Sequence, residues 1–417
     1  MISPTLLEDA FAVSTRWSAE MDLGTLIAQC LPDQSSAGAY VDVVAIGKSS
    51  REMAAATCQI LGSRVRRQIV VSDVGDEVSA PGEFVIVGEH PIPGAHSARA
   101  GDAVVNFLMS PEHASSVVFL LSGGASSLCV APAQPLTLED LGELWHGALR
   151  AGVDITTLNQ IRASTSLIGG GALLRHVRAA KSTSLILIDN VVSGAQWVAS
   201  AMTYDYKPTS REANELWGLI HVDQSLRSKM RAAFAKRRVL MERVPTTQHR
   251  NLVLADPAMM LDWALREARH RGYQTVDMGA RVTGDVKAVA SEWGQALRMA
   301  GPKSAVVGVG EVTVQVDGPG EGGRCQEFAW RMAKELANNS RDAIFLARSS
   351  DGRDFVRGVA GAWVSTDTWA RVGARNLNWD DVARTHNTHP ALATLGQLIE
   401  GEHTGWNLCD VFVALID

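Results

Sequence analysis

The sequence lacks the excess of positive charge that would point to nucleic-acid or membrane partners. Its 39 lysine and arginine residues stand against 45 aspartate and glutamate residues, which gives a formal net charge of −6. Binding to nucleic acid or to an anionic membrane surface needs a basic face, so we expect neither kind of partner. No apolar run approaches the length of a membrane-spanning helix.

Cysteine is scarce and follows no pattern. The five cysteines are Cys30, Cys58, Cys129, Cys325 and Cys409. Their number is odd, their spacing is wide and no C-x-x-C motif occurs, which favours free buried thiols in a reducing compartment. The N-terminal segment carries Glu8, Asp9 and Arg16 within an apolar pattern, unlike a signal peptide. We therefore expect a cytoplasmic protein.

Four familiar binding or catalytic signatures are also missing. The turn at Gly47-Lys48 lacks the glycine-rich run of a P-loop, and no G-x-G-x-x-G follows the first expected strand. No G-x-S-x-G elbow supports a serine hydrolase. His386, His389 and His403 lack the spacing and the fourth ligand of a zinc site.

Alternating apolar runs and helix-length segments dominate the first half of the chain. Short strands are expected at residues 41–46, 68–72, 84–88, 117–121 and 184–188. This alternation predicts an α/β fold with a mostly parallel sheet that helices cover on both faces.

The length of 417 residues allows two or three domains. Residues 205–248 are rich in lysine and arginine and read as a helical connection. A second α/β run begins near residue 251 and ends with a strand at residues 411–416. We expect a Rossmann-like domain over residues 1–240 and a smaller α/β region over residues 241–417.

Two glycine-rich turns are the most informative local features. They read Leu121-Ser122-Gly123-Gly124-Ala125-Ser126-Ser127 and Gly322-Gly323-Arg324-Cys325-Gln326-Glu327. Each follows a β-branched apolar run and precedes a helical pattern, so each aims backbone N–H groups at a point where a phosphate can sit. Arg324 adds a fixed positive charge. The two turns together predict an anionic ligand held between two lobes.

Further polar residues lie where a parallel sheet binds ligands. Lys48 begins the helix after the first strand and reads equally well as an anion contact or as an exposed helix-start lysine. Asp189 follows a buried strand and could hold Mg²⁺, accept a hydroxyl proton or cap the next turn. Asp351 and Asp354 are candidates for metal or nucleotide contacts, with an Asx-turn as the alternative.

The ordered set of motifs resembles the glycerate 2-kinase family, whose C-terminal half is called the MOFRL domain. The matching pieces are Ile46-Gly47-Lys48, His90-Pro91-Ile92-Pro93, Ser122-Gly123-Gly124-Ala125-Ser126, Asn159-Gln160-Ile161-Arg162, Leu187-Ile188-Asp189, Gly310-Glu311-Val312-Thr313-Val314, Gly322-Gly323-Arg324-Cys325-Gln326-Glu327, Asp351-Gly352 and Thr404-Gly405-Trp406-Asn407 with Asp410. No single piece is specific, whereas the ordered set over nearly the whole chain is.

The resemblance implies two α/β domains with an active site in the cleft between them. It implies ATP, Mg²⁺ and phosphoryl transfer to the 2-hydroxyl of D-glycerate. The family's key lysine, aspartate and arginine fall on Lys48, Asp189 and Arg324. The other expected contacts are Ser122, Gly123, Gly124, Ser126, Arg162, Glu311, Gly323, Gln326 and Glu327 for substrate or phosphate, Asp351 and Asn407 for the nucleotide, and Asp189 and Asp351 for the metal.

Basic residues of the family pattern are missing at three positions, which here are Ala163, Gly169 and Ala172. A charge-assisted contact is worth about 1.5–3 kcal/mol, so losing two costs roughly a hundredfold in affinity. Because Lys48, Asp189 and Arg324 are present, we favour a larger and less anionic acceptor over an inactive protein.

Two other functions stay open at this stage. The first is a catalytically silent relative that binds a metabolite or a partner protein. The second is a nicotinamide-dependent oxidoreductase of the hydroxypyruvate reductase kind. A homodimer is one of the oligomeric states left open.

Overall fold

The computed structural model describes residues 3–31, 39–80, 82–189, 194–316 and 318–417. The chain forms two compact units, which we call the first and the second unit. The first comprises Leu23–Ile188 and Val192–Ala255, and the second comprises Met1–Asp22, Asp189–Val191 and Asp256–Asp417. The main boundary between the units therefore lies between residues 255 and 256, whereas the sequence analysis expected it between residues 240 and 241.

The described residues of the first unit form a seven-stranded sheet in the order β3-β4-β2-β1-β5-β6-β7. Its strands are β1 (Val41–Ile46), β2 (Val65–Ser72), β3 (Val78–Ala80), β4 (Glu83–Val87), β5 (Ser116–Leu121), β6 (Lys181–Leu187) and β7 (Gln248–Ala255). Only β3 runs antiparallel to its neighbour among these strands. The central strand β1 is buried along its whole length, as a sheet covered on both faces requires. The expected Rossmann-like sheet is confirmed.

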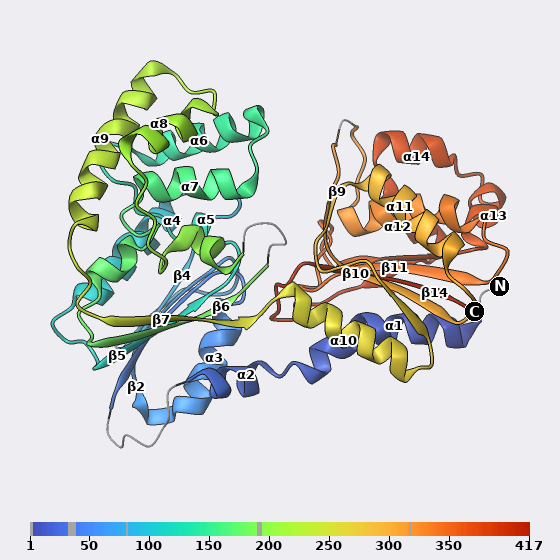
Figure 1. Ribbon diagram of the computed structural model, residues 1–417, viewed down its shortest axis with the longest axis horizontal. Helices are drawn as coiled ribbons and strands as arrows, with labels where there is room; N and C mark the ends of the chain where they lie inside the picture. The colour runs from blue at the N-terminus through green and yellow to red at the C-terminus, as the bar shows by residue number, and fades with distance from the viewer. Residues whose placement is uncertain (1–2, 32–38, 81, 190–193, 317) are drawn as a thin grey trace. The chain divides into compact units, whose positions relative to one another are not determined.

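Helices cover both faces of this sheet (Figure 1). One face carries α2 (Leu23–Cys30) and α3 (Ser50–Leu61), and the other carries α4 (Ala95–Met109) and α5 (Ala125–Leu128). A helical layer lies beyond α4 and α5. It contains α6 (Leu138–Ala151), α7 (Ile155–Thr165), α8 (Ser210–Gly218) and α9 (Gln224–Met241), with short 3₁₀ turns at Ala172–His176 and Ala195–Ala201.

Residues 205–248 belong to this helical layer. The segment is helical, as expected, but α8 and α9 pack inside the first unit instead of linking two domains. Trp217 on α8 and Phe234 on α9 meet edge to face with ring centroids 5.6 Å apart. Because α9 also carries many basic residues on its outer surface, the composition of the segment did not predict its buried apolar side.

The described part of the second unit holds a mixed sheet in the order β13-β12-β11-β14-β10-β8, with β9 also beside β10. The strands are β8 (Gln274–Asp277), β9 (Val282–Asp285), β10 (Ser304–Thr313), β11 (Ala343–Ser349), β12 (Val359–Ser365), β13 (Leu398–Glu400) and β14 (Asp410–Ile416). The last strand, β14, lies antiparallel between β10 and β11 in the middle of the sheet.

Two helical layers flank the mixed sheet (Figure 1). One holds α1 (Pro4–Glu20) and α10 (Pro257–His270), and the other holds α11 (Val286–Met299), α12 (Arg324–Leu336), α13 (Thr368–Ala374), α14 (Trp379–Thr385) and α15 (Thr388–Leu395). None of the helices in the described residues is both long and apolar enough to cross a membrane.

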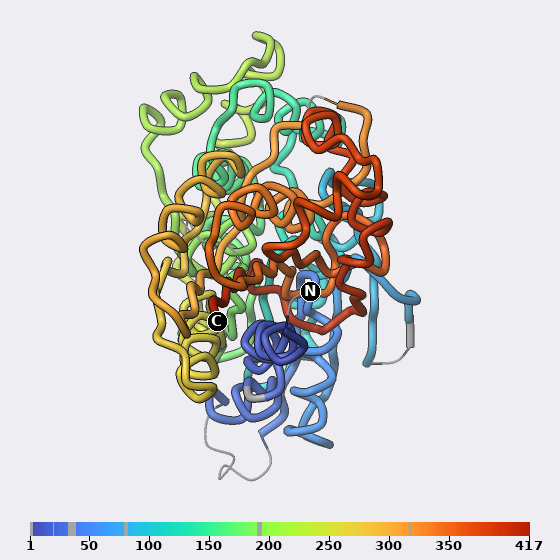
Figure 2. Tube along the Cα trace, turned by 90° about the vertical axis from the view of Figure 1, so that its right-hand side faces the viewer, coloured from blue at the N-terminus to red at the C-terminus, as the bar shows by residue number. Residues whose placement is uncertain are grey.

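The N-terminal helix packs against segments that lie more than 250 residues away in the sequence. Asp9 accepts hydrogen bonds from Arg271 (2.6 Å) and from the Tyr273 hydroxyl (2.7 Å), which follow α10. Figure 2 shows this dark blue helix among the late segments of the chain. The first 22 residues thus complete the second unit, and no linear division of the sequence could show this.

Four fully buried aromatic rings form the centre of the second unit. Trp293 on α11 and Phe328 on α12 meet Phe345 on β11 and Phe412 on β14. Their centroids lie between 4.7 and 6.1 Å apart, mostly edge to face, which is a favoured geometry for aromatic pairs.

Replacing Phe345 by alanine should lower the free energy of unfolding of the second unit by about 3–5 kcal/mol, because it removes a buried ring from this cluster. Phe355, which is 85% exposed, provides a matched control that should change little on the same substitution. Denaturant titration measures both values. Equal losses from the two variants would contradict the assigned core.

Candidate functional site

The turn after β1 is shaped by the glycine-rich turn after β5. Lys48 donates its backbone N–H to the carbonyl of Gly123 (2.9 Å), and the N–H of Ser49 donates to the Ser122 hydroxyl (3.1 Å). Gly47 has a φ of 131°, and a Cβ there would lie 2.2 Å from the Ser122 Oγ. Ser122 and Gly123 therefore hold Lys48 in place at the carboxyl edge of the parallel sheet.

Gly124 brings Lys48 and His90 together. It adopts a left-handed conformation (φ 82°), and a Cβ there would lie 3.2 Å from the Lys48 Cγ and 3.4 Å from the His90 Cδ2. His90 follows β4, so residues after β1, β4 and β5 meet at this edge, although β2 separates β4 from β1 in the sheet. This is the place where open α/β sheets bind ligands.

Two cations at this edge lack a negative partner. In the described part of the chain, no carboxylate forms an ion pair with Lys48 or with Arg162 on α7. Arg162 instead stacks on the ring of Trp145, with its guanidinium carbon 4.7 Å from the ring centroid. Burial lowers the pKa of Arg162 to about 10, so the group stays charged at neutral pH.

The pKa of His90 is lowered by its surroundings at this edge. Desolvation of the imidazole, together with repulsion from Lys48 and Arg162, lowers the pKa of His90 to about 4. The imidazole is therefore neutral at pH 7, mainly because burial disfavours its charged form and also because two cations lie near it. We call Lys48, His90 and Arg162 the cationic cluster.

A short polar row borders the cationic cluster. The hydroxyl groups of Ser126 and Ser200 lie 2.7 Å apart, and Ser200 donates to the side-chain oxygen of Asn159 (3.1 Å). Ser200 has a φ of 51° and lies between Ala199 (56°) and Ala201 (59°). Three consecutive non-glycine residues in the left-handed region are costly, and such strain concentrates at functional sites.

The three positions that lack the family's basic residues lie in packed surroundings. Ala163 and Ala172 are fully buried, and Ala163 packs beside Trp197. Two arginine side chains of the first unit donate to backbone carbonyls near these positions. Arg237 on α9 donates to the carbonyl of Gly170 (2.9 Å), and Arg175 donates to that of Gly171 (2.7 Å). These guanidinium groups stabilise the turn and are not free for a ligand.

Arg324, the first residue of α12, lies between two carboxylates in the second unit. Its Nε and Nη2 donate to the carboxylate of Asp410 at 2.5 and 3.0 Å, and its Nη1 pairs with Glu311. Asp410 is fully buried, whereas the side chain of Glu311 is 42% exposed. Asp410 therefore orients the guanidinium, and Glu311 covers its outward side.

The amide groups at the start of α12 already have an anion. The Asp354 carboxylate accepts from the N–H groups of Cys325 (3.0 Å) and Gln326 (2.9 Å). A Cβ at Gly323 would lie 2.2 Å from the Asp354 Cγ, so glycine admits this close approach. Burial, and the nearby Asp410, raise the pKa of Asp354 to about 6.

Gln326 and Glu327 serve the packing of α12. The Gln326 amide donates to Asp354 (3.0 Å), and the buried Glu327 accepts from Arg331 on the same helix (2.6 and 2.9 Å). Both side chains thus have partners inside the second unit.

Asp189 and Asn407 lie side by side in the second unit. The Asn407 side chain donates to the Asp189 carboxylate (3.2 Å), and the Cys409 thiol donates to the Asp189 carbonyl (2.7 Å). Asp351 accepts from the Ser349 hydroxyl and the Arg353 N–H, both at 2.8 Å, in an Asx-type turn. Among the described residues, no group of three or more histidine, cysteine or acidic side chains is placed to hold a metal ion.

Sequence reasoning gave no role to several residues that shape these sites. They are His90, Trp145, Asn159, Ser200 and Asp410. Asp354 was expected as a metal or nucleotide contact or in an Asx-turn, and the structure shows it accepting from the N–H groups at the start of α12. A histidine just after a strand and an acidic residue at the start of an apolar final strand were visible signals for His90 and Asp410. Nothing in the sequence pairs Ser200 with Ser126.

Two family models match the chain. The domain of unknown function DUF4147 matches residues 17–235, and the MOFRL family matches residues 304–410. A D-glycerate 2-kinase from Thermotoga maritima is 27% identical over 388 residues, which cover 90% of each chain, and a glycerate 2-kinase from Pyrococcus horikoshii is 26% identical over 90% of this chain and 87% of its own. This chain is a divergent member of the glycerate 2-kinase family.

The fold of this family member agrees with a solved relative. The crystal structure of a glycerate kinase from Thermotoga maritima superimposes with a TM-score of 0.84 at 23% identity, covering all of both chains. One relative of similar likeness, from Agrobacterium vitis, carries a hydroxypyruvate reductase name; it is 26% identical over 90% of this chain and 98% of its own.

The charge of the cationic cluster should set the titration of His90. Replacing Lys48 or Arg162 by glutamine should raise the His90 pKa from about 4 part of the way towards the ordinary value, because each cation contributes to the shift but desolvation is its largest cause. Histidine-selective NMR measures this titration. Arg150→Gln, an exposed change on α6, should leave it unchanged. An unmoved His90 pKa in both test variants would show that these cations do not act on it.

Proposed function

We propose that this protein transfers the γ-phosphoryl group of ATP to a hydroxyl of D-glycerate or of a related, larger hydroxylated metabolite. The observation that carries the proposal is the cationic cluster, in which Lys48 and Arg162 have no carboxylate partner among the described residues. Phosphoryl transfer depends mainly on positioning and on stabilising spread negative charge, which such cations supply. Family membership adds relatives that are named glycerate kinases.

The reaction assigns one role to each of three residues. The acceptor oxygen forms a bond to the γ-phosphorus, the bond from that phosphorus to the bridging oxygen of ADP breaks, and the hydroxyl proton passes to the Asp189 carboxylate. Lys48 and Arg324 stabilise the charge on the transferred group. Asp410 acts as a positioning residue, because its two contacts fix the Arg324 guanidinium.

Glu311 affects how Arg324 can act. Its half-exposed carboxylate pairs with the Arg324 Nη1, the one guanidinium nitrogen that Asp410 leaves unbonded. An incoming phosphate would compete with Glu311 for this group, so we assign Glu311 to the control of Arg324 and not to direct phosphate contact. Its exposure makes its displacement inexpensive.

The acidic residues fit a magnesium ion that arrives with the nucleotide. Mg²⁺ usually keeps several waters and binds substrate phosphates together with one or two carboxylates. Asp189 and Asp351 would supply these, and no cluster of three protein ligands is needed. When bound, the ion would neutralise phosphate charge. We also assign Asn407, which donates to Asp189, to contact with the nucleotide.

Two other functions remain to be separated from this one. The missing basic residues at Ala163, Gly169 and Ala172 are the reason to consider a relative without catalytic activity. Ala163 and Ala172 are nevertheless buried in packed surroundings, so the fold is intact there. The reductase name of the Agrobacterium vitis relative motivates an oxidoreductase. Oxidation of NADH with hydroxypyruvate, in the absence of ADP release, would favour the latter.

A coupled assay of ADP release with MgATP and D-glycerate tests the proposal. Lys48→Gln, Asp189→Asn and Arg324→Gln should each lower kcat/KM by about 10²–10⁴-fold, because each removes charge stabilisation or proton transfer. Lys287→Gln, an exposed change on α11, should have no effect. Absence of ADP release with D-glycerate and with a panel of 2-hydroxy acids would overturn the proposal.

A further inference from the structure

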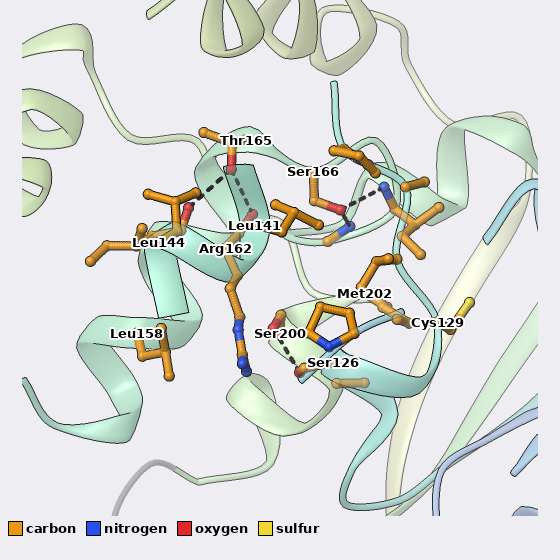
Figure 3. Close-up of a pocket in the computed structure, with 18 of the residues that line it drawn as sticks. Ser126, Cys129, Leu141, Leu144, Leu158, Arg162, Thr165, Ser166, Ser200 and Met202 are labelled. Carbon is orange, nitrogen blue, oxygen red and sulfur yellow. Dashed lines mark hydrogen bonds between the residues drawn. The ribbon is translucent and has the colours of Figure 1, made fainter. Parts of the chain in front are cut away.

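A narrow apolar cavity adjoins the cationic cluster inside the first unit (Figure 3). Its volume is about 50 Å³, enough for a small alkyl group or for a few water molecules. Leu141 and Leu144 of α6 and Leu158 and Ile161 of α7 form much of its wall. An apolar wall of this kind holds water poorly, so the cavity is suited to an apolar group of a ligand.

Hydroxyl groups deeper in the cavity are already engaged by the protein. The Ser166 hydroxyl oxygen accepts from the N–H groups of Ile168 (3.1 Å) and Gly169 (2.9 Å). The Thr165 hydroxyl lies 3.4 Å from the carbonyl oxygen of Ile161, within hydrogen-bond range. Figure 3 shows these contacts as dashed lines. The inner cavity therefore offers little to a second polar group of a ligand.

Arg162 is the only charged side chain among the described residues that line the cavity. Its guanidinium stacks on Trp145, which also lines the cavity, and has no carboxylate partner there. In Figure 3 the guanidinium lies at the same end of the cavity as Ser126 and Ser200. The cavity thus combines one cation at its polar end with an apolar interior.

We propose that the acceptor is a 2-hydroxy carboxylic acid with a compact apolar substituent. This inference rests on the proposed kinase function and names its substrate class. The carboxylate pairs with Arg162, the apolar substituent fills the cavity, and the hydroxyl lies on the side of Ser126 and Lys48. The hydroxymethyl group of glycerate would instead place a hydroxyl in a mainly apolar cavity that offers it few polar partners, which is unfavourable.

The expected preference for a larger apolar substituent can be given as a ratio of binding affinities. Burial of one methylene strengthens binding about fourfold, so a four-carbon branched substituent should bind on the order of a hundredfold tighter than a methyl group. A single apolar pocket discriminates less sharply against a slightly shorter chain, by roughly tenfold or more.

Calorimetric titration without nucleotide tests this inference apart from catalysis. The probes are D-glycerate, lactate, 2-hydroxy-4-methylpentanoate and 3-phenyllactate. The branched acid should bind at least tenfold tighter than D-glycerate. Arg162→Gln should weaken binding of the branched acid at least tenfold, but should leave the affinity for the uncharged 4-methylpentane-1,2-diol unchanged. Arg162→Lys should restore part of the loss.

Two further variants test the cavity itself. Ala131 lines it, so Ala131→Leu should fill it and abolish the preference for the branched acid. Leu141→Ala should enlarge it and shift the preference towards 3-phenyllactate. Leu149→Ala, on the exposed side of α6, is the matched control and should change neither affinity.

The outcomes separate this inference from the kinase proposal. ADP release with D-glycerate but equal binding of all four acids would overturn the apolar acceptor and leave the kinase intact. Tight, cavity-dependent binding of the branched acid without ADP release from any acid would retain the ligand class and overturn the kinase. Unchanged affinities in both cavity variants would place the ligand elsewhere.

Discussion

The proposed site in the first unit depends on two positive charges that form no ion pair with any carboxylate of the described residues. Lys48 and Arg162 lie at the carboxyl edge of a parallel sheet, and both lower the pKa of His90, so all three groups share one local field. A protein keeps like charges close together only where the surrounding structure holds them. Here the Gly47 turn is held by Ser122, and Arg162 is held by stacking on Trp145. The proposed function places a bound anion between these two cations, where it would pair with both charges.

In the second unit, by contrast, the charged groups discussed above are paired with opposite charges or hydrogen-bond donors. Arg324 is matched by Asp410 and Glu311, and the start of α12 is closed by the protein's own Asp354. Its groups are thus ordered before any ligand arrives, as preorganised electrostatic catalysis requires. The proposed function uses the cations of the first unit for binding and the oriented groups of the second unit for chemistry. Within the first unit, Lys48 and Arg162 supply positive charge although Ala163 and Ala172 carry none.

Strand runs and glycine positions allowed the parallel sheet and the main turns to be predicted, because burial on both faces forces continuous apolar strands. The place of α1 in the second unit could not be predicted, since Asp9 meets Arg271 and Tyr273 only after the chain has folded. The same holds for the site. Lys48 and Arg324 carry signals in their own turns, whereas Arg162, within α7, was named only through the family resemblance. The role of Asp354 at the start of α12 depends on a contact between segments 29 residues apart, and the acceptor cavity depends on how α6 and α7 pack.

The claim that Lys48 and Arg162 form a prepared anion site is tested most directly by calorimetric titration with inorganic pyrophosphate, which needs neither an acceptor nor turnover. The native protein should give a saturable isotherm that weakens as salt is added, because the attraction is electrostatic. The double variant Lys48→Gln, Arg162→Gln should lose at least tenfold in affinity. Indistinguishable isotherms for the two proteins would contradict the account.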